Sequence, residues 1–339
     1  MTQRPSFATW RAGGYANAAA PRRADPASLQ KLAGRTMGTT WSLVCDNPAM
    51  LALDAVEAAV QVALDRVIDQ MSTWEAASDI SRFNAAAAGS WQALPPAFAE
   101  VLGCALHWAQ ASDGAIDPTV GPLVALWGFG AHAQGIAEAM QAPSPAALAE
   151  ARLRTGWQRL AFDAAAGRIT QPGGLSLDLS GVAKGFAVDQ VADALQALGL
   201  RDLLVEVGGE LRGLGRRPGG ASWRVRVDAD GEDLPPVALN DLAIATSGDR
   251  WHAHEHGGRR WSHTIDPRSG EPASVALASV TVLHARCMQA DALATALTVL
   301  GAVDGPAFAQ RHGIAALFVC RDGSAPRVTA TEAWRALNT

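Results

Sequence analysis

The chain has 339 residues, 49% of them hydrophobic and 18% charged, and its formal net charge is −5. This balance indicates an ordinary globular protein of one large domain or two closely packed ones. Basic residues never run longer than two in a row, which argues against a nucleic-acid groove. No apolar run reaches the roughly 18 residues of a membrane span.

The N-terminal part of the chain is small and polar and contains several prolines. We expect residues 1–33 to be a flexible leader and residues 34–339 to form the folded domain, as two intimately packed lobes. No signal peptide is readable, so we expect a cytoplasmic protein. The cysteines are far apart in apolar contexts and are expected to be free buried thiols, at Cys45, Cys104, Cys287 and Cys320.

Apolar periodicity predicts strands and helices along the whole chain. Strands are expected at residues 34–45, 157–162, 167–171, 203–207, 223–227, 242–245, 252–256, 261–265, 280–283 and 314–320. Helices are expected at residues 51–71, 78–84, 95–109, 145–155, 288–301 and 306–312. Strands in both hairpins and βαβ-like steps indicate an α+β fold, with mixed or antiparallel sheets packed by helices.

Residues 178–199 form the stretch around which the chain is organised. Its second half has the periodicity of a helix that Gly199 ends. Its first half is expected to be a turn that places Gly181, Lys184 and Gly185 at the helix entrance. Small residues would let a ligand approach the backbone there, and free N–H groups with a lysine favour an anion such as a phosphorylated ligand. The alternative is a solvated helix start with an incidental lysine.

Glycines also cluster at residues 208–215, as they do in dinucleotide-binding folds. A strand rather than a helix is predicted after them, at residues 223–227, so no helix N-terminus would hold a pyrophosphate. We therefore reject a Rossmann site.

Asp291 and Thr295 lie four residues apart, on one face near the start of a predicted helix. A carboxylate and a hydroxyl are the hard oxygen ligands that Mg²⁺ takes, and the rest of its octahedron is left for water and phosphate oxygens. The alternative is an ordinary helix N-terminus, where such a pair serves charge and packing.

Other polar residues are open to two interpretations. His263 could be a general base or a phosphate donor, or a structural histidine. Asp117 and Asp178 could accept hydrogen bonds from a sugar or an adenine amine, or could cap turns. On a strand, the side chains of the histidines at residues 252–256 would share one face and could bind a transition metal. Otherwise they flank a hairpin before Gly257-Gly258, and their side chains are solvated.

Several of these segments together resemble the ApbE family, the FAD:protein FMN transferases. The matching segments follow the family order and are residues 37–39, 71–74, 114–130, 178–189, 207–209, 245–249, 263–272 and 290–295. The resemblance implies a two-lobed α+β fold in which FAD binds in a cleft between the lobes.

The resemblance also implies roles for individual residues. Flavin contacts are expected from Met37, Trp74, Ala115, Ile116, Asp117, Asp178, Lys184 and Ile265. Ser247 and His263 are expected near the phosphates. The metal is expected to take the carbonyl of Gly181 together with Asp291 and Thr295, in agreement with the ligand chemistry above.

The implied reaction is Mg²⁺-dependent transfer of FMN from FAD to a Thr or Ser hydroxyl of an acceptor flavoprotein, with release of AMP. Mg²⁺ and Lys184 would neutralise the pyrophosphate, and His263 or Asp291 would take the hydroxyl proton. His263 is preferred because a metal-bound carboxylate is the poorer base.

The chain departs from the family in one respect. Members are usually exported, often as lipoproteins, yet no N-terminal lipid-bearing cysteine or export signal is readable here. Three other functions compete with FMN transfer. They are hydrolysis of FAD to FMN and AMP, FAD binding without catalysis, and a hydrolase that uses Ser180 and Lys184, although the Ser-x-x-Lys register is lacking.

Overall fold

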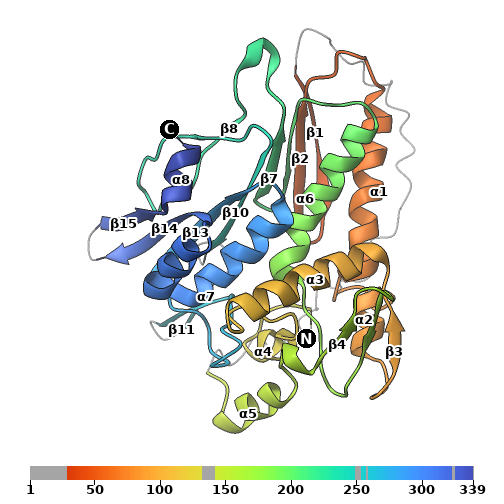
Figure 1. The fold of residues 1–339 in the computed structure, drawn as a ribbon, viewed down its shortest axis with the longest axis vertical. Helices are drawn as coiled ribbons and strands as arrows, with labels where there is room; N and C mark the ends of the chain where they lie inside the picture. The colour runs from red at the N-terminus through yellow and green to blue at the C-terminus, as the bar shows by residue number, and fades with distance from the viewer. Residues whose placement is uncertain (1–28, 132–141, 249–252, 257–258, 323–324, 339) are drawn as a thin grey trace, which may run out of the picture.

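The computed structural model describes residues 29–131, 142–248, 253–256, 259–322 and 325–338. Its centre is an eight-stranded sheet in which every neighbouring pair is antiparallel (Figure 1). In spatial order its strands are β1 (Gln30–Thr36), β2 (Thr39–Cys45), β6 (Leu203–Val207), β7 (Glu210–Leu214), β10 (Leu242–Gly248), β13 (Leu277–His284), β14 (Ala315–Asp322) and β15 (Ala325–Ala330). The α+β prediction is confirmed, with antiparallel rather than mixed pairing.

The first two strands form a hairpin where a single strand was predicted at residues 34–45. Met37 and Gly38 make its turn with φ of 47° and 71°, and two successive positive φ values suit a tight hairpin. β1 begins at Gln30, so residues 30–33 belong to the sheet rather than to the predicted leader. Alternation in β1 buries Leu32 against the core, which explains why pairing extends this far.

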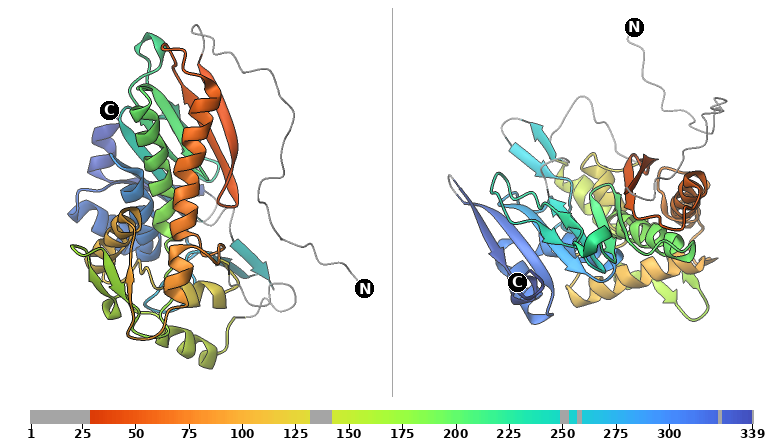
Figure 2. Two further views of the ribbon diagram at one scale, coloured as in Figure 1. Left: turned by 90° about the vertical axis from the view of Figure 1, so that its right-hand side faces the viewer. Right: turned by 90° about the horizontal axis from the view of Figure 1, so that it is seen from above.

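The helices of the described chain are α1 (Leu53–Met71), α2 (Asp79–Asn84), α3 (Pro96–Ala111), α4 (Gly121–Leu126), α5 (Pro145–Leu153), α6 (Ser180–Ala197), α7 (Cys287–Arg311) and α8 (Glu332–Leu337). Some of them pack on the two faces of the large sheet. α1, α6 and α7 lie on one face, with α1 alongside α6 (Figure 2). α3 crosses the end of this layer, and α8 packs on β14 at the opposite face (Figure 1).

Side chains alternate between the two faces of β13 and so pack into two separate hydrophobic cores. Val280 and Val282 are fully buried against α7, whereas Leu283 packs with Trp334 of α8 on the other face. β13 is thus buried on both faces, and of its residues only Ser279 and His284 are partly exposed.

α7 is broken at Gly301, where φ of 78° and ψ of −169° are not helical. β14 lies antiparallel to β13, with Ala315 opposite Leu283, so the chain must return to the end of the sheet that it left. An unbroken helix of this length would carry it about 37 Å away. The two helices predicted at residues 288–301 and 306–312 are thus the two arms of α7. By length and composition α7 could also span a membrane, but 56% of its apolar window is buried inside the fold.

The remaining elements are small. β3 (Trp91–Ala93), β5 (Arg168–Thr170) and β4 (Ala161–Asp163) form a three-stranded sheet, and two hairpins pair β8 (Arg224–Val225) with β9 (Val237–Ala238) and β11 (Ala253–His256) with β12 (Arg259–Ser262). Short 3₁₀ turns occupy Trp157–Arg159 and Pro218–Gly220. β15 and α8 follow the strand that was predicted to close the fold.

Candidate active site

The stretch at residues 178–199 folds differently from the prediction in its first half. α6 already begins at Ser180, whose N–H donates to Asp178 Oδ1 at 2.8 Å. Gly181 and Gly185 therefore lie inside the first turns of the helix rather than in a turn before it. The predicted end of the helix is confirmed, because Gly199 has φ of 97°, a value that glycine adopts easily.

α6 and α7 pack directly on each other. Three pairs of residues mark the line of contact, and they are Gly181 with Thr295, Gly185 with Asp291, and Asp189 with Cys287. Each step moves four residues forward on α6 and four residues back on α7. The two helices therefore run in opposite directions along this line and meet once per turn.

The glycines of α6 make room for α7. A Cβ on Gly185 would lie 2.3 Å from the carbonyl oxygen of Cys287 and 2.7 Å from Cβ of Asp291. A Cβ on Gly181 would lie 3.0 Å from Thr295 Oγ1. The prediction that small residues here let a ligand approach the backbone is therefore wrong for Gly185, because α7 itself occupies that space.

Oxygen atoms from both helices gather at this crossing. The hydroxyl of Thr295 lies 3.5 Å from the carbonyl oxygen of Gly181, and the N–H of Gly185 donates to Asp291 Oδ2 at 2.9 Å. This N–H is therefore used within the protein. The sequence had suggested that it would bind an anion, but it is already bonded to Asp291. The structure does bring together the three predicted metal ligands, Gly181, Asp291 and Thr295.

Lys184, one turn along α6, forms an ion pair with Glu210 of β7. The Lys184 side chain is 36% exposed, whereas that of Glu210 is only 4% exposed. Burial alone would lower the pKa of Lys184, but the carboxylates of Glu210 and Asp291 outweigh it and raise this pKa. Lys184 is thus held positively charged.

Both carboxylates beside Lys184 are poorly solvated. Burial raises the pKa of Glu210 to about 7, against the opposing effect of Lys184. Burial likewise raises the pKa of Asp291, although Lys184 and the N–H of Gly185 lower it. Glu210 Oε2 is buried and has no hydrogen-bond partner among the residues that the structure describes. Glu210 and Asp291 thus share one positive neighbour, Lys184, and burial disfavours their charged forms, so a further cation beside them would stabilise both charges.

No role was predicted for Glu210, although the sequence places it two residues before Arg212, a spacing that puts both charges on one face of a strand. Buried positions alternate along β7 at Glu210, Arg212 and Leu214, so two charged residues share the face that packs on α6. They meet Lys184 and Asp189 of α6 as two opposite charge pairs. Five helical residues rise about 7.5 Å and two strand residues about 6.7 Å, so the two spacings match.

A second group of predicted residues lies in the loop after α3. Ala115, Ile116 and Asp117 are all buried. Asp117 Oδ1 accepts hydrogen bonds from both the N–H and the hydroxyl of Thr119 at 2.7 Å, and Oδ2 accepts from the N–H of Trp157 at 3.2 Å. Its carboxylate thus organises the loop. Burial raises its pKa, while these hydrogen bonds lower it.

The loop contacts the start of α6, and α4, which follows the loop, packs on Ile265. The N–H of Asp178 donates to the carbonyl of Pro118 at 2.8 Å, which joins the loop to the start of α6. Ile265 is buried in a cluster with Leu123 of α4. His263, two residues before it, is half-buried, with its ring centroid 6.4 Å from that of Phe129.

The other predicted flavin contacts come from separate elements. Met37 lies at the β1–β2 turn, two residues before Thr39. A Cβ on Gly208 would lie 3.0 Å from Cγ2 of Thr39 and 3.5 Å from Cδ of Lys184. Trp74 lies after α1 with 74% of its surface exposed, and Ser247 lies on β10 opposite Val280. Of the histidine cluster, His252 and the side chains of His254 and His256 lie outside the described residues. The hairpin predicted there is present in the backbone.

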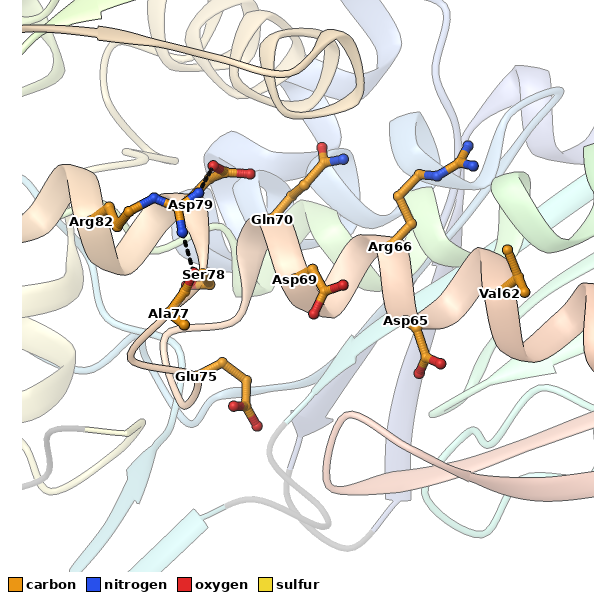
Figure 3. Close-up of a pocket in the computed structure, with 10 residues that line it drawn as sticks. All are labelled: Val62, Asp65, Arg66, Asp69, Gln70, Glu75, Ala77, Ser78, Asp79 and Arg82. Atoms are coloured by element: carbon orange, nitrogen blue, oxygen red, sulfur yellow. Dashed lines mark hydrogen bonds and ion pairs between the residues drawn. The ribbon is translucent and has the colours of Figure 1, made fainter. Parts of the chain in front are cut away.

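A surface pocket between α1 and α2 contains none of the predicted residues (Figure 3). Arg82 pairs with Asp79 at one end of it. It is lined by Val62, Asp65, Arg66, Asp69, Gln70, Glu75, Ala77, Ser78, Asp79 and Arg82. Four carboxylates against two guanidinium groups would repel a pyrophosphate, so we do not place the anionic ligand there.

The chain matches the model of the ApbE family over residues 37–318. The chain belongs to the ApbE family. An FAD:protein FMN transferase of Vibrio cholerae is 37% identical over 301 residues, which cover 87% of this chain and 89% of that protein. One of Haemophilus influenzae is 34% identical over 305 residues, or 86% of each chain.

Solved structures of ApbE proteins have the same fold. The apo form of the flavinyl transferase ApbE of Pseudomonas stutzeri superposes with a TM-score of 0.85 and 39% identity, over 91% of this chain and 96% of that one. A histidine-to-glycine mutant of the flavin transferase ApbE of Vibrio cholerae superposes with a TM-score of 0.84 and 34% identity, over 91% of this chain and 99% of that one.

The four cysteines are buried and free, as predicted.

Proposed function

We propose that this chain is an FAD:protein FMN transferase, which moves FMN from FAD to a Thr or Ser hydroxyl of an acceptor flavoprotein. Relatives with that name cover most of its length. The observation that carries the proposal is the crossing of α6 and α7, where oxygens of Gly181, Asp291 and Thr295 converge beside Lys184.

The donor set fits Mg²⁺. A carboxylate, a hydroxyl and a backbone carbonyl are hard oxygen ligands, and few protein ligands leave positions for water and phosphate oxygens. Burial disfavours the charged forms of Asp291 and Glu210, so a cation here would stabilise both charges. Bound Mg²⁺ would neutralise part of the pyrophosphate charge of FAD.

In the proposed reaction the acceptor oxygen attacks the flavin-side phosphorus of FAD. A new P–O bond forms to the acceptor, the P–O bond to the bridging oxygen breaks, and AMP leaves with that oxygen. Lys184 binds the negatively charged diphosphate, and His263 accepts the proton of the attacking hydroxyl. Ser247 is proposed to lie near the phosphates when FAD is bound.

The flavin is proposed to bind in a cleft between two lobes. Its contacts would come from Met37, Trp74, Ala115, Ile116, Asp117, Asp178 and Ile265. Trp74 supports this placement, because an exposed indole offers a face on which a flat aromatic ring can stack.

The test is incubation of the purified protein with FAD, Mg²⁺ and a candidate acceptor, followed by in-gel flavin fluorescence and measurement of AMP. We expect a fluorescent acceptor band and one AMP for each flavin transferred. AMP without a labelled acceptor would instead show hydrolysis of FAD. Bound flavin without AMP would show a non-catalytic flavin-binding protein.

A further inference from the structure

Asp189 of α6 is fully buried and has its carboxylate at the N-terminus of α7. Oδ1 accepts a hydrogen bond from the N–H of Cys287 at 3.0 Å, and Oδ2 accepts one from the N–H of Met288, also at 3.0 Å. The first N–H groups of a helix have no partner within it. α7 has no capping side chain from its own N-cap, Arg286, so a neighbouring helix supplies the cap.

Two arginines hold this carboxylate in place. Arg212 of β7 donates to Asp189 Oδ1 at 3.0 Å, and Arg286 lies 3.3 Å from Oδ2. Both arginines also bind Asp193, one turn further along α6, at 2.9–3.0 Å. Asp189 thus joins α6, β7 and α7 at one point, whereas no α7 N–H donates to Asp193 among the described residues.

The cap lies one turn from the proposed metal site. Along the line where α6 meets α7, Asp189 is four residues beyond Gly185, and Cys287 is four residues before Asp291. A shift or rotation of α7 at its first turn would therefore be carried along a stiff helix to Asp291 and Thr295. Outer groups that orient metal ligands commonly change metal affinity when they are altered.

We propose that Asp189 is a positioning residue. It sets the position of α7 along its own axis and its rotation about that axis, and so the place of Asp291 and Thr295 relative to Gly181. This inference rests on the proposed function, in which these three residues bind Mg²⁺. Asp189 itself touches neither the metal nor the substrate in this arrangement.

The test compares Asp189→Asn with Asp193→Asn, since each removes one charge from the same arginine pair and only the first removes a cap bond. Apparent Mg²⁺ affinity is measured on metal-free protein, without FAD, from the rise in melting temperature during a Mg²⁺ titration. We expect Asp189→Asn to weaken Mg²⁺ binding by about tenfold or more and Asp193→Asn by less than about threefold. Equal affinities in the two variants would overturn the inference.

Hydrogen exchange of the unaltered protein gives a second readout that does not depend on whether a variant folds. The amides of Cys287 and Met288 should be as protected as those in the middle of α7, and rapid exchange at both would also overturn the inference. Asp291→Ala separates this proposal from the metal assignment. If Asp291→Ala binds Mg²⁺ like the unaltered protein, the proposed metal site fails. If only Asp189→Asn does so, the positioning role fails alone.

Discussion

The N–H of Gly185 donates a hydrogen bond to Asp291 Oδ2 at 2.9 Å, between helices whose two residues are 106 positions apart in the chain. The bond is possible only because Gly185 has no side chain, since the backbone of Cys287 occupies the position of a Cβ. Close packing of α6 on α7 and assembly of the candidate metal site are therefore one structural event.

Gly185→Ala should push the two helices apart. A Cβ at 2.3 Å from a backbone carbonyl cannot be relieved by a side-chain rotation, so we expect a loss of about 2–3 kcal/mol in the free energy of unfolding. Urea denaturation measures it. Gly103→Ala in α3 is the matched control, because its nearest neighbour would be 3.8 Å away. Alanine there should be neutral or stabilising by up to about 1 kcal/mol. Equal stabilities of the two variants would contradict this packing.

Asp291→Asn should separate metal binding from folding. Burial raises the pKa of Asp291, so its charge weakens the metal-free fold at neutral pH, and the amide can still accept from Gly185. We expect the melting temperature of the metal-free protein to rise by about 2–4 °C. Its response to Mg²⁺ and the transfer of FMN should be lost. Undiminished labelling of the acceptor by this variant would remove the metal from the mechanism.

Lys184→Met should leave Glu210 buried without its cation. Because Lys184 is partly exposed, we expect the loss of stability to be about 1–3 kcal/mol, between the values typical of a surface pair and of a buried pair. Adding Glu210→Gln should restore most of it. FAD affinity should remain low in the double variant but not in Glu210→Gln alone. Recovery of FAD binding in the double variant would show that Lys184 acts only through Glu210.

The Lys184–Glu210 pair also predicts how stability depends on pH. The folded-state pKa of Glu210 is raised from 4.5 to about 7, so its favourable contribution is present below pH 4.5 and is lost as the pH rises through 7. The pKa of Lys184 is also raised, so Lys184 keeps its charge throughout this range. Between pH 5 and 8 the unaltered protein should therefore lose more stability than Glu210→Gln, as measured by urea denaturation. Parallel pH profiles would rule out the burial effect.

His263→Ala should slow FMN transfer by about 10²–10⁴-fold if His263 takes the hydroxyl proton. Single-turnover labelling of the acceptor measures this rate, and FAD and Mg²⁺ affinities are measured alongside to show that binding is retained. His107→Ala is a suitable control because His107 is exposed on α3. A normal rate in His263→Ala would move the role of base to another group, such as Asp291.

The sequence by itself determined the local elements and much of the chemistry. The helices at residues 51–71 and 78–84 and the end of α6 at Gly199 were predicted closely, because periodicity and capping are read over a few residues. The spacing of Asp291 and Thr295 placed both on one helix face for the same reason. Motif order along the chain indicated the family.

Only the tertiary structure decided what these faces meet. Gly185 serves helix packing rather than ligand approach, and Glu210 and Asp189 acquire their roles from side chains on other elements. The hairpin at Met37-Gly38 and the strand start at Gln30 also depend on pairing partners. The local sequence pattern determines the face of a helix or strand on which a side chain lies. The group that it faces is fixed by contacts between segments far apart in the chain, and local periodicity does not encode them.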